Sequence, residues 1–138
     1  MPVTVNIKMY RLRELGDCFL LCFMNNGEKS HVLIDCGSYW NKTSSIERLK
    51  TIAGDIKEQL QDNPLNVIVG THQHNDHLSG FVHAESIFRK IKPEQIWLSW
   101  LDDPESEVAR KIGVDFNNYL TSLRQINKEL KSSYFAGD

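Results

Sequence analysis

The chain has 138 residues, of which 41% are hydrophobic and 25% charged, and a formal net charge of −2. A chain of this length buries about two thirds of its unfolded surface as one domain, whereas its near-neutral charge offers no broad attraction to nucleic acid or anionic lipid. No apolar run approaches the ~20 residues that cross a bilayer, so we predict a single domain over residues 1–138 without a membrane span.

The N-terminal residues and the cysteines indicate where the protein resides. Residues 1–16 lack the apolar core and small-residue cleavage site of a signal peptide. Cys18, Cys22 and Cys36 are odd in number and fit no disulfide framework, as is typical of a reducing compartment. We therefore predict a cytoplasmic protein with free thiols and no membrane partner.

Three strands are predicted in the first third of the chain. Apolar and polar side chains alternate from Val3 to Met9, which is the pattern of a half-buried strand. Residues 18–24 and 31–35 are two further apolar runs, and the segment NNGEKS between them is typical of a turn. These two runs are predicted to form a hairpin.

Helices and strands alternate in the rest of the chain. Between residues 44 and 61, apolar side chains recur at spacings of three and four, which predicts an amphipathic helix. Residues 65–69 form a short apolar strand, residues 79–91 a second helix and residues 95–100 another strand. A long helix is predicted after the acidic segment DDPESE and continues past Lys128.

This element order indicates an α/β fold with a mixed sheet and flanking helices. In such folds, ligands bind beyond the carboxyl ends of the strands. The predicted strand at residues 65–69 runs directly into the segment THQHNDH, which contains three of the five histidines of the chain. This segment is the strongest candidate for a functional site.

His72, His74, Asp76 and His77 are the candidate metal ligands. An extended backbone would project His72 and His74 from the same side, and Asp76 and His77 follow where the chain turns. These ligand types suit zinc, and also iron or manganese, and two ions about 3.5 to 4 Å apart would fit such an arrangement. The alternative is a polar loop whose histidines bond only to backbone or solvent, which four ligand-type residues at this spacing disfavour.

The segment THQHNDHLSG resembles the HxHxDH signature of the metallo-β-lactamase superfamily. The segments GDCFLL and HVLIDCG resemble the opening hairpin of that family, with Asp35 as its strand-end aspartate. The resemblance covers residues 3–100. Within the family, this chain most resembles the hydrolase domain of bacterial DNA-uptake channel proteins. It implies an αβ/βα sandwich made of two similar halves, of which this chain supplies the N-terminal half.

The resemblance also implies a role for each candidate residue. His72 and His74 would bind the first of two zinc ions, and Asp76 and His77 would bind the second. Asp76 would in addition be the catalytic residue that orients the attacking water. Asp35 would hold the ligand loop from behind by accepting hydrogen bonds, or, as the alternative, would only cap a turn at the end of its strand.

The family completes its site with a histidine, an aspartate and a last histidine farther along the chain. This chain has no histidine after His83, and we interpret His83 and His31 as lying outside the site. Asp138 follows glycine, as the bridging aspartate of the family often does, but its terminal position disfavours that role. Because two catalytic ions need more than four ligands, we expect this chain alone to be inactive, with the remaining ligands in a missing C-terminal half or a homodimer partner.

Two functions from different classes are consistent with these residues. The first is a metal-dependent hydrolase, or its N-terminal part, in which a metal-activated water attacks an ester or phosphoester substrate. The second is a non-catalytic interaction module that retains a vestigial metal-binding loop. The substrate stays open between a small molecule and a phosphoester, and the net charge gives no support for nucleic acid.

Overall fold

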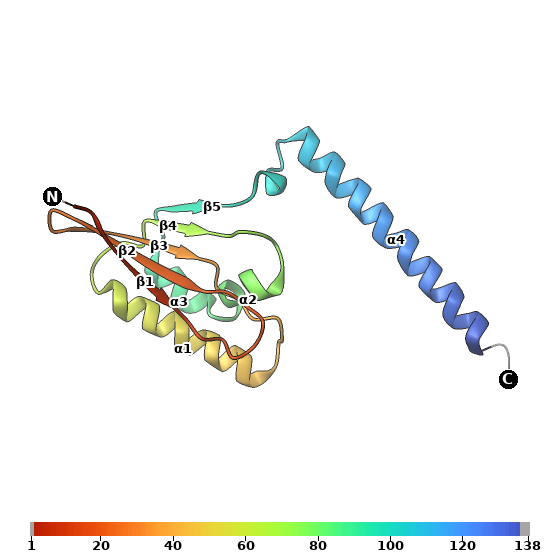
Figure 1. Cartoon of the computed structure of the whole chain (residues 1–138), viewed down its shortest axis with the longest axis horizontal. Helices are drawn as coiled ribbons and strands as arrows, with labels where there is room; N and C mark the ends of the chain where they lie inside the picture. The colour runs from red at the N-terminus through yellow and green to blue at the C-terminus, as the bar shows by residue number, and fades with distance from the viewer. Residues whose placement is uncertain (1, 136–138) are drawn as a thin grey trace. The chain divides into compact units, whose positions relative to one another are not determined.

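The computed structural model describes residues 2–135, with side chains described as far as residue 128. The chain divides into two compact units, residues 1–98 and residues 99–138. The strands of the first unit are β1 (Thr4–Met9), β2 (Phe19–Asn25), β3 (Glu28–Ile34), β4 (Val67–Val69) and β5 (Gln95–Trp97). Its helices are α1 (Thr43–Leu60), α2 (Asn75–His83) and α3 (Glu85–Ile91), as Figure 1 shows.

The strands form one mixed sheet in the order β1-β2-β3-β4-β5. Neighbouring strands from β1 to β3 are antiparallel, whereas β4 is parallel to both β3 and β5. Parallel neighbours require a crossover connection, and α1 provides it between β3 and β4, as α2 and α3 do between β4 and β5. The predicted α/β class with a mixed sheet and flanking helices is confirmed.

The hairpin turn between β2 and β3 is tighter than the sequence analysis predicted. Asn25 pairs with Glu28, so only Asn26 and Gly27 form the turn. Both residues have positive φ, 52° and 88° respectively, as a two-residue type I′ turn requires. The polar residues that follow the turn were predicted to be loop, but they extend β3 instead because this turn fixes the register.

The second predicted helix starts earlier than residue 79 and is interrupted. α2 begins at Asn75, so Asp76 and His77 lie in its first turn rather than in a loop. Ala84, with φ −112° and ψ 25°, separates α2 from α3. The apolar spacing continues across this break, and for that reason the sequence pattern predicted one helix.

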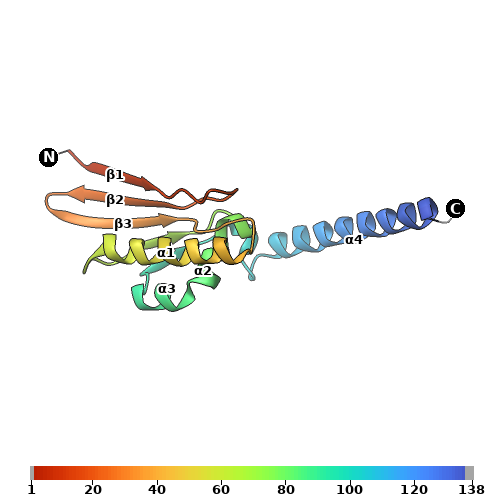
Figure 2. The same cartoon turned by 90° about the horizontal axis from the view of Figure 1, so that it is seen from below.

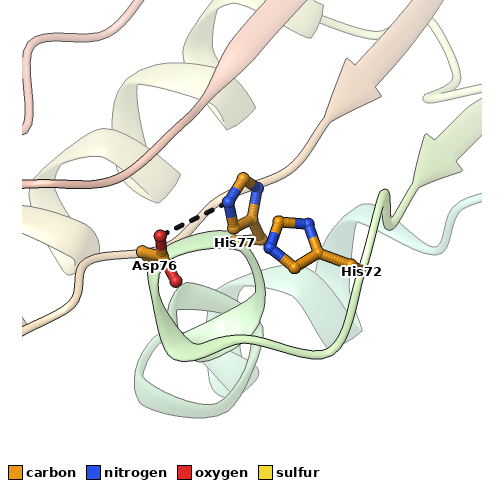
Figure 3. Close-up of side chains that lie close together, drawn as sticks. All are labelled: His72, Asp76 and His77. Carbon is orange, nitrogen blue, oxygen red and sulfur yellow. Dashed lines mark ion pairs between the residues drawn. The ribbon is translucent and has the colours of Figure 1, made fainter.

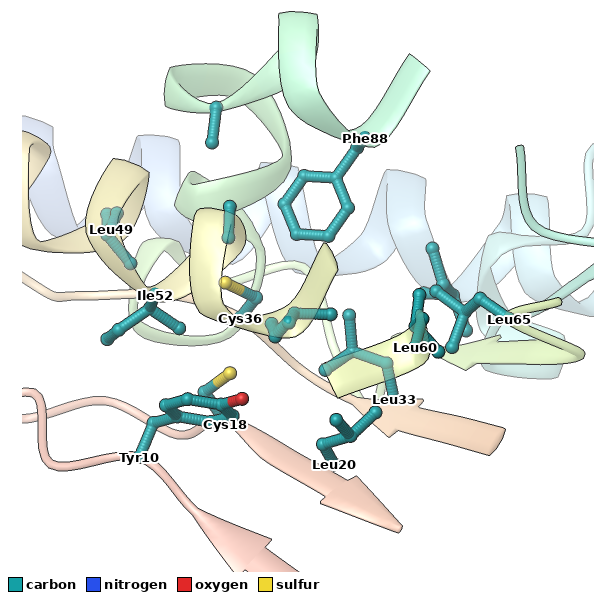
Figure 4. Packing of buried hydrophobic residues seen from close by; sticks show 14 of the residues in the cluster. Tyr10, Cys18, Leu20, Leu33, Cys36, Leu49, Ile52, Leu60, Leu65 and Phe88 are labelled. Carbon is teal, nitrogen blue, oxygen red and sulfur yellow. The ribbon is translucent and has the colours of Figure 1, made fainter. Parts of the chain in front are cut away.

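The hydrophobic core lies between the sheet and its helices, which cover one face of the sheet in Figure 2. Leu20, Leu33 and Ile68 come from three neighbouring strands and are no more than 6% exposed. The apolar stripe of α1 packs against them and comprises Leu49, Ile52, Ala53, Ile56 and Leu60. Figure 4 shows part of this core, with labels on Tyr10, Cys18, Leu20, Leu33, Cys36, Leu49, Ile52, Leu60, Leu65 and Phe88.

The opposite face of the sheet is also apolar, and no helix of residues 2–98 covers it. Successive side chains of a strand point to opposite faces, so the neighbours of the core residues point away from the helices. On β1, Val5, Ile7 and Met9 are between 42% and 70% exposed, and Trp97 on β5 is 57% exposed. This one-sided layer is the architecture expected of half an αβ/βα sandwich.

The second unit contains a 3₁₀ turn, η1 (Trp100–Asp102), and the long helix α4 (Glu107–Phe135). The strand predicted over residues 95–100 therefore ends early, and Trp100 lies in η1. The predicted long helix is confirmed. The hydroxyl of Ser106 accepts a hydrogen bond from the backbone N–H of Ala109 at 3.2 Å near the start of α4. Within the described residues, no helix is both long enough and apolar enough to pass through a lipid bilayer.

Candidate metal centre

The candidate site lies where the parallel strands β3 and β4 end. Ile34 and Val69 are register partners, and the backbone N–H of Asp35 donates to the Val69 carbonyl at 2.9 Å. Both strands therefore deliver their following residues to the same edge of the sheet. This edge carries Asp35 on one side and the segment that contains the histidines on the other.

His72, Asp76 and His77 come together at this edge, as Figure 3 shows. One ligand atom from each lies within 4.8 Å of the other two. The ring centroids of His72 and His77 are 3.7 Å apart, and Nε2 of His77 lies 3.4 Å from Oδ2 of Asp76. Two ligands bound at about 2.1 Å to one tetrahedral zinc ion would be about 3.4 Å apart, so this pair fits a single ion.

His74 lies beside this group but does not join it. Its side chain is exposed, and its ring centroid lies 4.6 Å from that of His72. The sequence spacing predicted that His72 pairs with His74, whereas the structure brings His72 together with Asp76 and His77. The reason is the early start of α2, whose first turn carries Asp76 and His77 back toward His72.

Asp35 lies behind the ligand group and contacts it through hydrogen bonds. Asp35 is 2% exposed, and its carboxylate accepts hydrogen bonds from the backbone N–H of Thr71 at 2.9 Å and from the Thr71 hydroxyl at 2.6 Å. Nδ1 of His77 lies 2.7 Å from the Asp35 carboxylate. Because a carboxylate can only accept, Nδ1 carries the proton, and Nε2 is left free to bind a metal.

Asp17 also reaches the site, although the sequence analysis assigned it no role. Its Oδ2 lies 3.8 Å from Nδ1 of His77. Its backbone N–H donates to the Asp76 carbonyl at 3.0 Å, and its own carbonyl accepts from Gly37 at 3.1 Å. The only sequence signal was an aspartate at the turn that precedes a buried strand, which is also an ordinary place for a turn residue.

The loop after β3 packs directly against the first turn of α2. A Cβ atom on Gly37 would lie 2.4 Å from the backbone nitrogen of His77 and 2.5 Å from the carbonyl oxygen of Asn75, so a side chain does not fit there. Cys36 donates its backbone N–H to His77 at 2.7 Å and accepts from Gly80 at 2.8 Å. The backbone of His77 is thus held by the loop after β3, which also supplies Asp35.

Glu14 connects three segments around the site. Its carboxylate accepts hydrogen bonds from the hydroxyls of Ser45 at 2.8 Å and Ser38 at 2.9 Å. The backbone N–H of Ser38 in turn donates to the hydroxyl of Ser79 on α2 at 3.0 Å. The hydrogen bond from Ser45, followed by that from Ser38, lowers the pKa of the Glu14 carboxyl below its ordinary value. No local sequence pattern predicted a role for Glu14.

The remaining residues considered in the sequence analysis lie outside the ligand group. His31 is 2% exposed, and burial lowers the pKa of its ring. Nε2 of His83 lies 3.0 Å from the side-chain oxygen of Asn41. Asp138 lies outside the described residues.

Two cavities differ in their relation to the ligands. A cavity of about 350 Å³ borders the site and is lined by Leu15, Tyr39, His74, Asn75 and Asp76. A larger cavity of about 480 Å³ is lined mainly by apolar side chains of α2, α3 and β5 and by no candidate ligand. Because a substrate has to reach the ligands, the smaller cavity is the better candidate for its binding.

Comparison with known proteins places this site in a family. Searches of curated proteins and of solved structures found no match. A family model described as the metallo-beta-lactamase superfamily matches residues 12–125. This match covers most of the chain and includes Asp17, Asp35 and the complete histidine segment. The chain therefore belongs to the metallo-beta-lactamase superfamily.

Proposed function

We propose that this protein is a metal-dependent hydrolase that uses metal-activated water to attack an ester or phosphoester bond. The observation that carries this proposal is the convergence of ligand atoms from His72, Asp76 and His77 within 4.8 Å of one another. Membership of a superfamily composed mostly of hydrolases supports it. The substrate is a small molecule or a phosphoester.

Zinc is the metal that we propose, although imidazole and carboxylate ligands also suit iron and manganese. When bound, zinc would supply a water molecule whose pKa is lowered to roughly 7 as the nucleophile. In the complete site we propose two ions, one held by His72 and His74 and the other by Asp76 and His77. The ring of His74, 4.6 Å from that of His72, is close enough to contribute.

The protein residues orient the reactants. We propose that Asp76 is the catalytic residue, because its carboxylate faces His77 and also borders the cavity of about 350 Å³. Asp35 keeps the proton of His77 on Nδ1, and Asp17 adds negative charge that favours a bound cation. Leu15 and Tyr39 give the same cavity an apolar wall for the part of a substrate that does not react.

Zinc titration of the metal-free protein tests the proposed ligands. We expect His72→Ala and His77→Ala to weaken zinc binding at least tenfold, while His83→Ala, whose ring lies outside the ligand group, serves as the matched control. Hydrolysis of 4-nitrophenyl acetate and of bis(4-nitrophenyl) phosphate would then distinguish esterase from phosphodiesterase activity. If the wild-type protein bound none of the three metals zinc, iron and manganese, this result would contradict the proposal.

A non-catalytic interaction module is the second candidate, and the small ligand set favours it. Among the described residues, three ligand-type side chains converge, whereas two three-ligand sites need about five or six protein groups even when one is shared. A loop that binds one ion without hydrolysing either substrate would support this candidate. The remaining ligands would then be absent or would come from a C-terminal half or a partner copy.

The relation to DNA-uptake channel proteins and the cytoplasmic location are also proposals. The resemblance to the hydrolase domain of DNA-uptake channel proteins would be supported by cleavage of single-stranded DNA and contradicted by activity confined to small esters. A cytoplasmic location would be checked by fractionation of cells that produce the protein. The formal net charge of −2 adds no support for nucleic acid as a substrate.

A further inference from the structure

We propose that α4 self-associates with copies of this chain through a heptad seam, in a bundle of more than two helices. The seam is an apolar stripe in which the spacing alternates between three and four residues, as at positions a and d of a coiled coil. Its members are Ala109, Phe116 and Leu123 at a, and Ile112, Tyr119 and Ile126 at d. The same spacing reaches Leu130 in the sequence, whose side chain lies outside the described residues.

The large residues of the seam are exposed within the described part of the chain. Phe116, Tyr119 and Leu123 are between 60% and 68% exposed, and Ile112 and Ile126 are 45% and 51% exposed. Ala109 alone is buried, at 4%, where α4 meets η1. A continuous row of this kind is costly in water, so a partner that covers it would stabilise the helix.

The narrowness of the stripe favours another helix as that partner. Between residues 110 and 128, the positions outside the seam are polar or charged except Gly113, Val114 and Leu120. A helix that packs on a sheet or in a globular core usually has a broader apolar face. A seam limited to a and d is the form that fits a coiled coil.

The charges beside the seam favour a second copy over a different helix. Positions e and g select partners through charge, and between residues 113 and 127 these positions hold Gly113, Asp115, Leu120, Ser122 and Asn127. Only one of these residues is charged. Identical helices therefore meet without like-charge repulsion along the seam, and nothing selects an oppositely charged partner.

The seam residues and the available area favour more than two copies. Leu123 at a with Ile126 at d is an arrangement that favours trimers or tetramers over parallel dimers. α4 has 29 residues, and a helix of this length offers a face about 44 Å long and about 10 Å wide, or on the order of 440 Å². This is about half of the roughly 800 Å² that each partner buries in a typical stable complex. Contact with two neighbours doubles the area.

Sedimentation equilibrium of the full chain tests this inference. The chain is measured over about 5 to 200 µM, a range that covers moderate association constants. We expect a mass of at least three chains at the upper concentration. Leu123→Asp should weaken association at least tenfold. Val114→Asp should leave it unchanged, because Val114 is as exposed as Leu123 (59% against 61%) but lies outside the seam. Both variants place aspartate in the same helix, so a general loss of helix would affect them equally.

Three results would overturn the inference. The first is a wild-type chain that stays monomeric at the highest concentration, which would mean that the seam is covered within one chain. The second is an equal response of Leu123→Asp and Val114→Asp. The third is an assembly that survives Leu123→Asp but is lost in Ile7→Asp, because Ile7 lies on the open face of the sheet and is 67% exposed.

Discussion

At the scale of single residues, the site depends on carboxylates that lie behind the candidate ligands. Asp35 contacts both Thr71 and His77, and it adopts a left-handed backbone with φ 53°. Aspartate and asparagine are the non-glycine residues that tolerate this conformation best. An asparagine at this position can therefore test the charge and the hydrogen-bonding role without displacing the backbone.

Asp35→Asn should weaken zinc binding by about 10–100-fold, as loss of a partner behind a ligand typically does. The amide of asparagine has one accepting oxygen and one NH₂ group, so either Nδ1–H of His77 or the backbone N–H of Thr71 loses its acceptor. An amide NH₂ that faces another N–H donor in a buried position should also lower the free energy of unfolding of the metal-free protein by about 1–3 kcal/mol. Competition with a chromogenic chelator and urea denaturation measure the two effects.

The control for that variant is Asp55→Asn, which removes a carboxylate that contacts Lys8 and Tyr10 rather than the site. Zinc affinity should be unchanged in Asp55→Asn, because the effect of Asp35 is specific to the site. Equal zinc affinities for wild type and Asp35→Asn would contradict the role that we give to Asp35.

Glu14 should make stability depend on pH. The hydrogen bond from Ser45 lowers the pKa of this carboxyl in the folded state, so its contribution is complete above the unfolded pKa of about 4.3 and is lost as pH falls through the lower folded value. Glu14→Gln should thus cost more stability at pH 7 than at pH 3. Urea denaturation at both pH values measures this difference.

An exposed glutamate of α1, Glu47, provides the comparison for Glu14. Glu47→Gln removes a carboxyl from the exposed side of the same helix that carries Ser45, and its stability is measured at the same two pH values. If the difference between wild type and Glu14→Gln did not shrink on acidification, the hydrogen bonds from Ser38 and Ser45 would not be responsible for it.

At the scale of elements, the close approach of the loop after β3 to α2 positions the site. Gly37→Ala should displace the first turn of α2, because its Cβ would meet backbone atoms of His77 and Asn75 that cannot rotate away. We expect a loss of about 1–3 kcal/mol in the free energy of unfolding, together with weaker zinc binding. Thermal denaturation and zinc titration measure these changes.

Gly54→Ala is the matched control for Gly37→Ala. Gly54 lies inside α1, and a Cβ there would meet nothing within 4 Å. Alanine is favoured over glycine in a helix by about 1 kcal/mol, so this variant should be more stable than wild type with unchanged zinc affinity. A Gly37→Ala protein as stable as wild type would show that the loop and helix can separate at no cost.

The elements also show which features local sequence patterns predict. Apolar periodicity predicted α1 and α4, because each presents a continuous stripe of apolar side chains. It did not predict the start of α2 at Asn75, since the first turn of that helix carries polar candidate ligands instead of core residues. The turn at Asn26 was likewise predicted as a longer loop, because the polar residues after it pair through their backbone alone.

The same distinction applies to the site. The spacing of His72, Asp76 and His77 was visible because these ligands are neighbours in the chain. The contacts of Asp17 and Glu14 join residues 20 to 60 positions apart, and a single sequence carries no local signal for such pairs. Their roles became apparent only when the strands brought these segments to one edge of the sheet.

At the scale of the whole molecule, each unit leaves an apolar surface exposed within the described residues. In residues 1–98 it is the face of the sheet that carries Ile7 and Trp97, and in residues 99–128 it is the seam of α4. The sheet face is where the second half of an αβ/βα sandwich would pack. The two surfaces have different shapes, one broad and one narrow, and so they suit different kinds of partner.

Strand order in this sheet is the same as chain order, so every strand pairs with the strand made just before it. Such a sheet can grow in one direction during synthesis on the ribosome, because no strand waits for a distant partner. Asp17 and Asp35 would already be in place when the histidine segment emerges. Once translation has passed His83, the nascent chain contains every residue of the candidate centre, although β5 and α4 have not yet been translated.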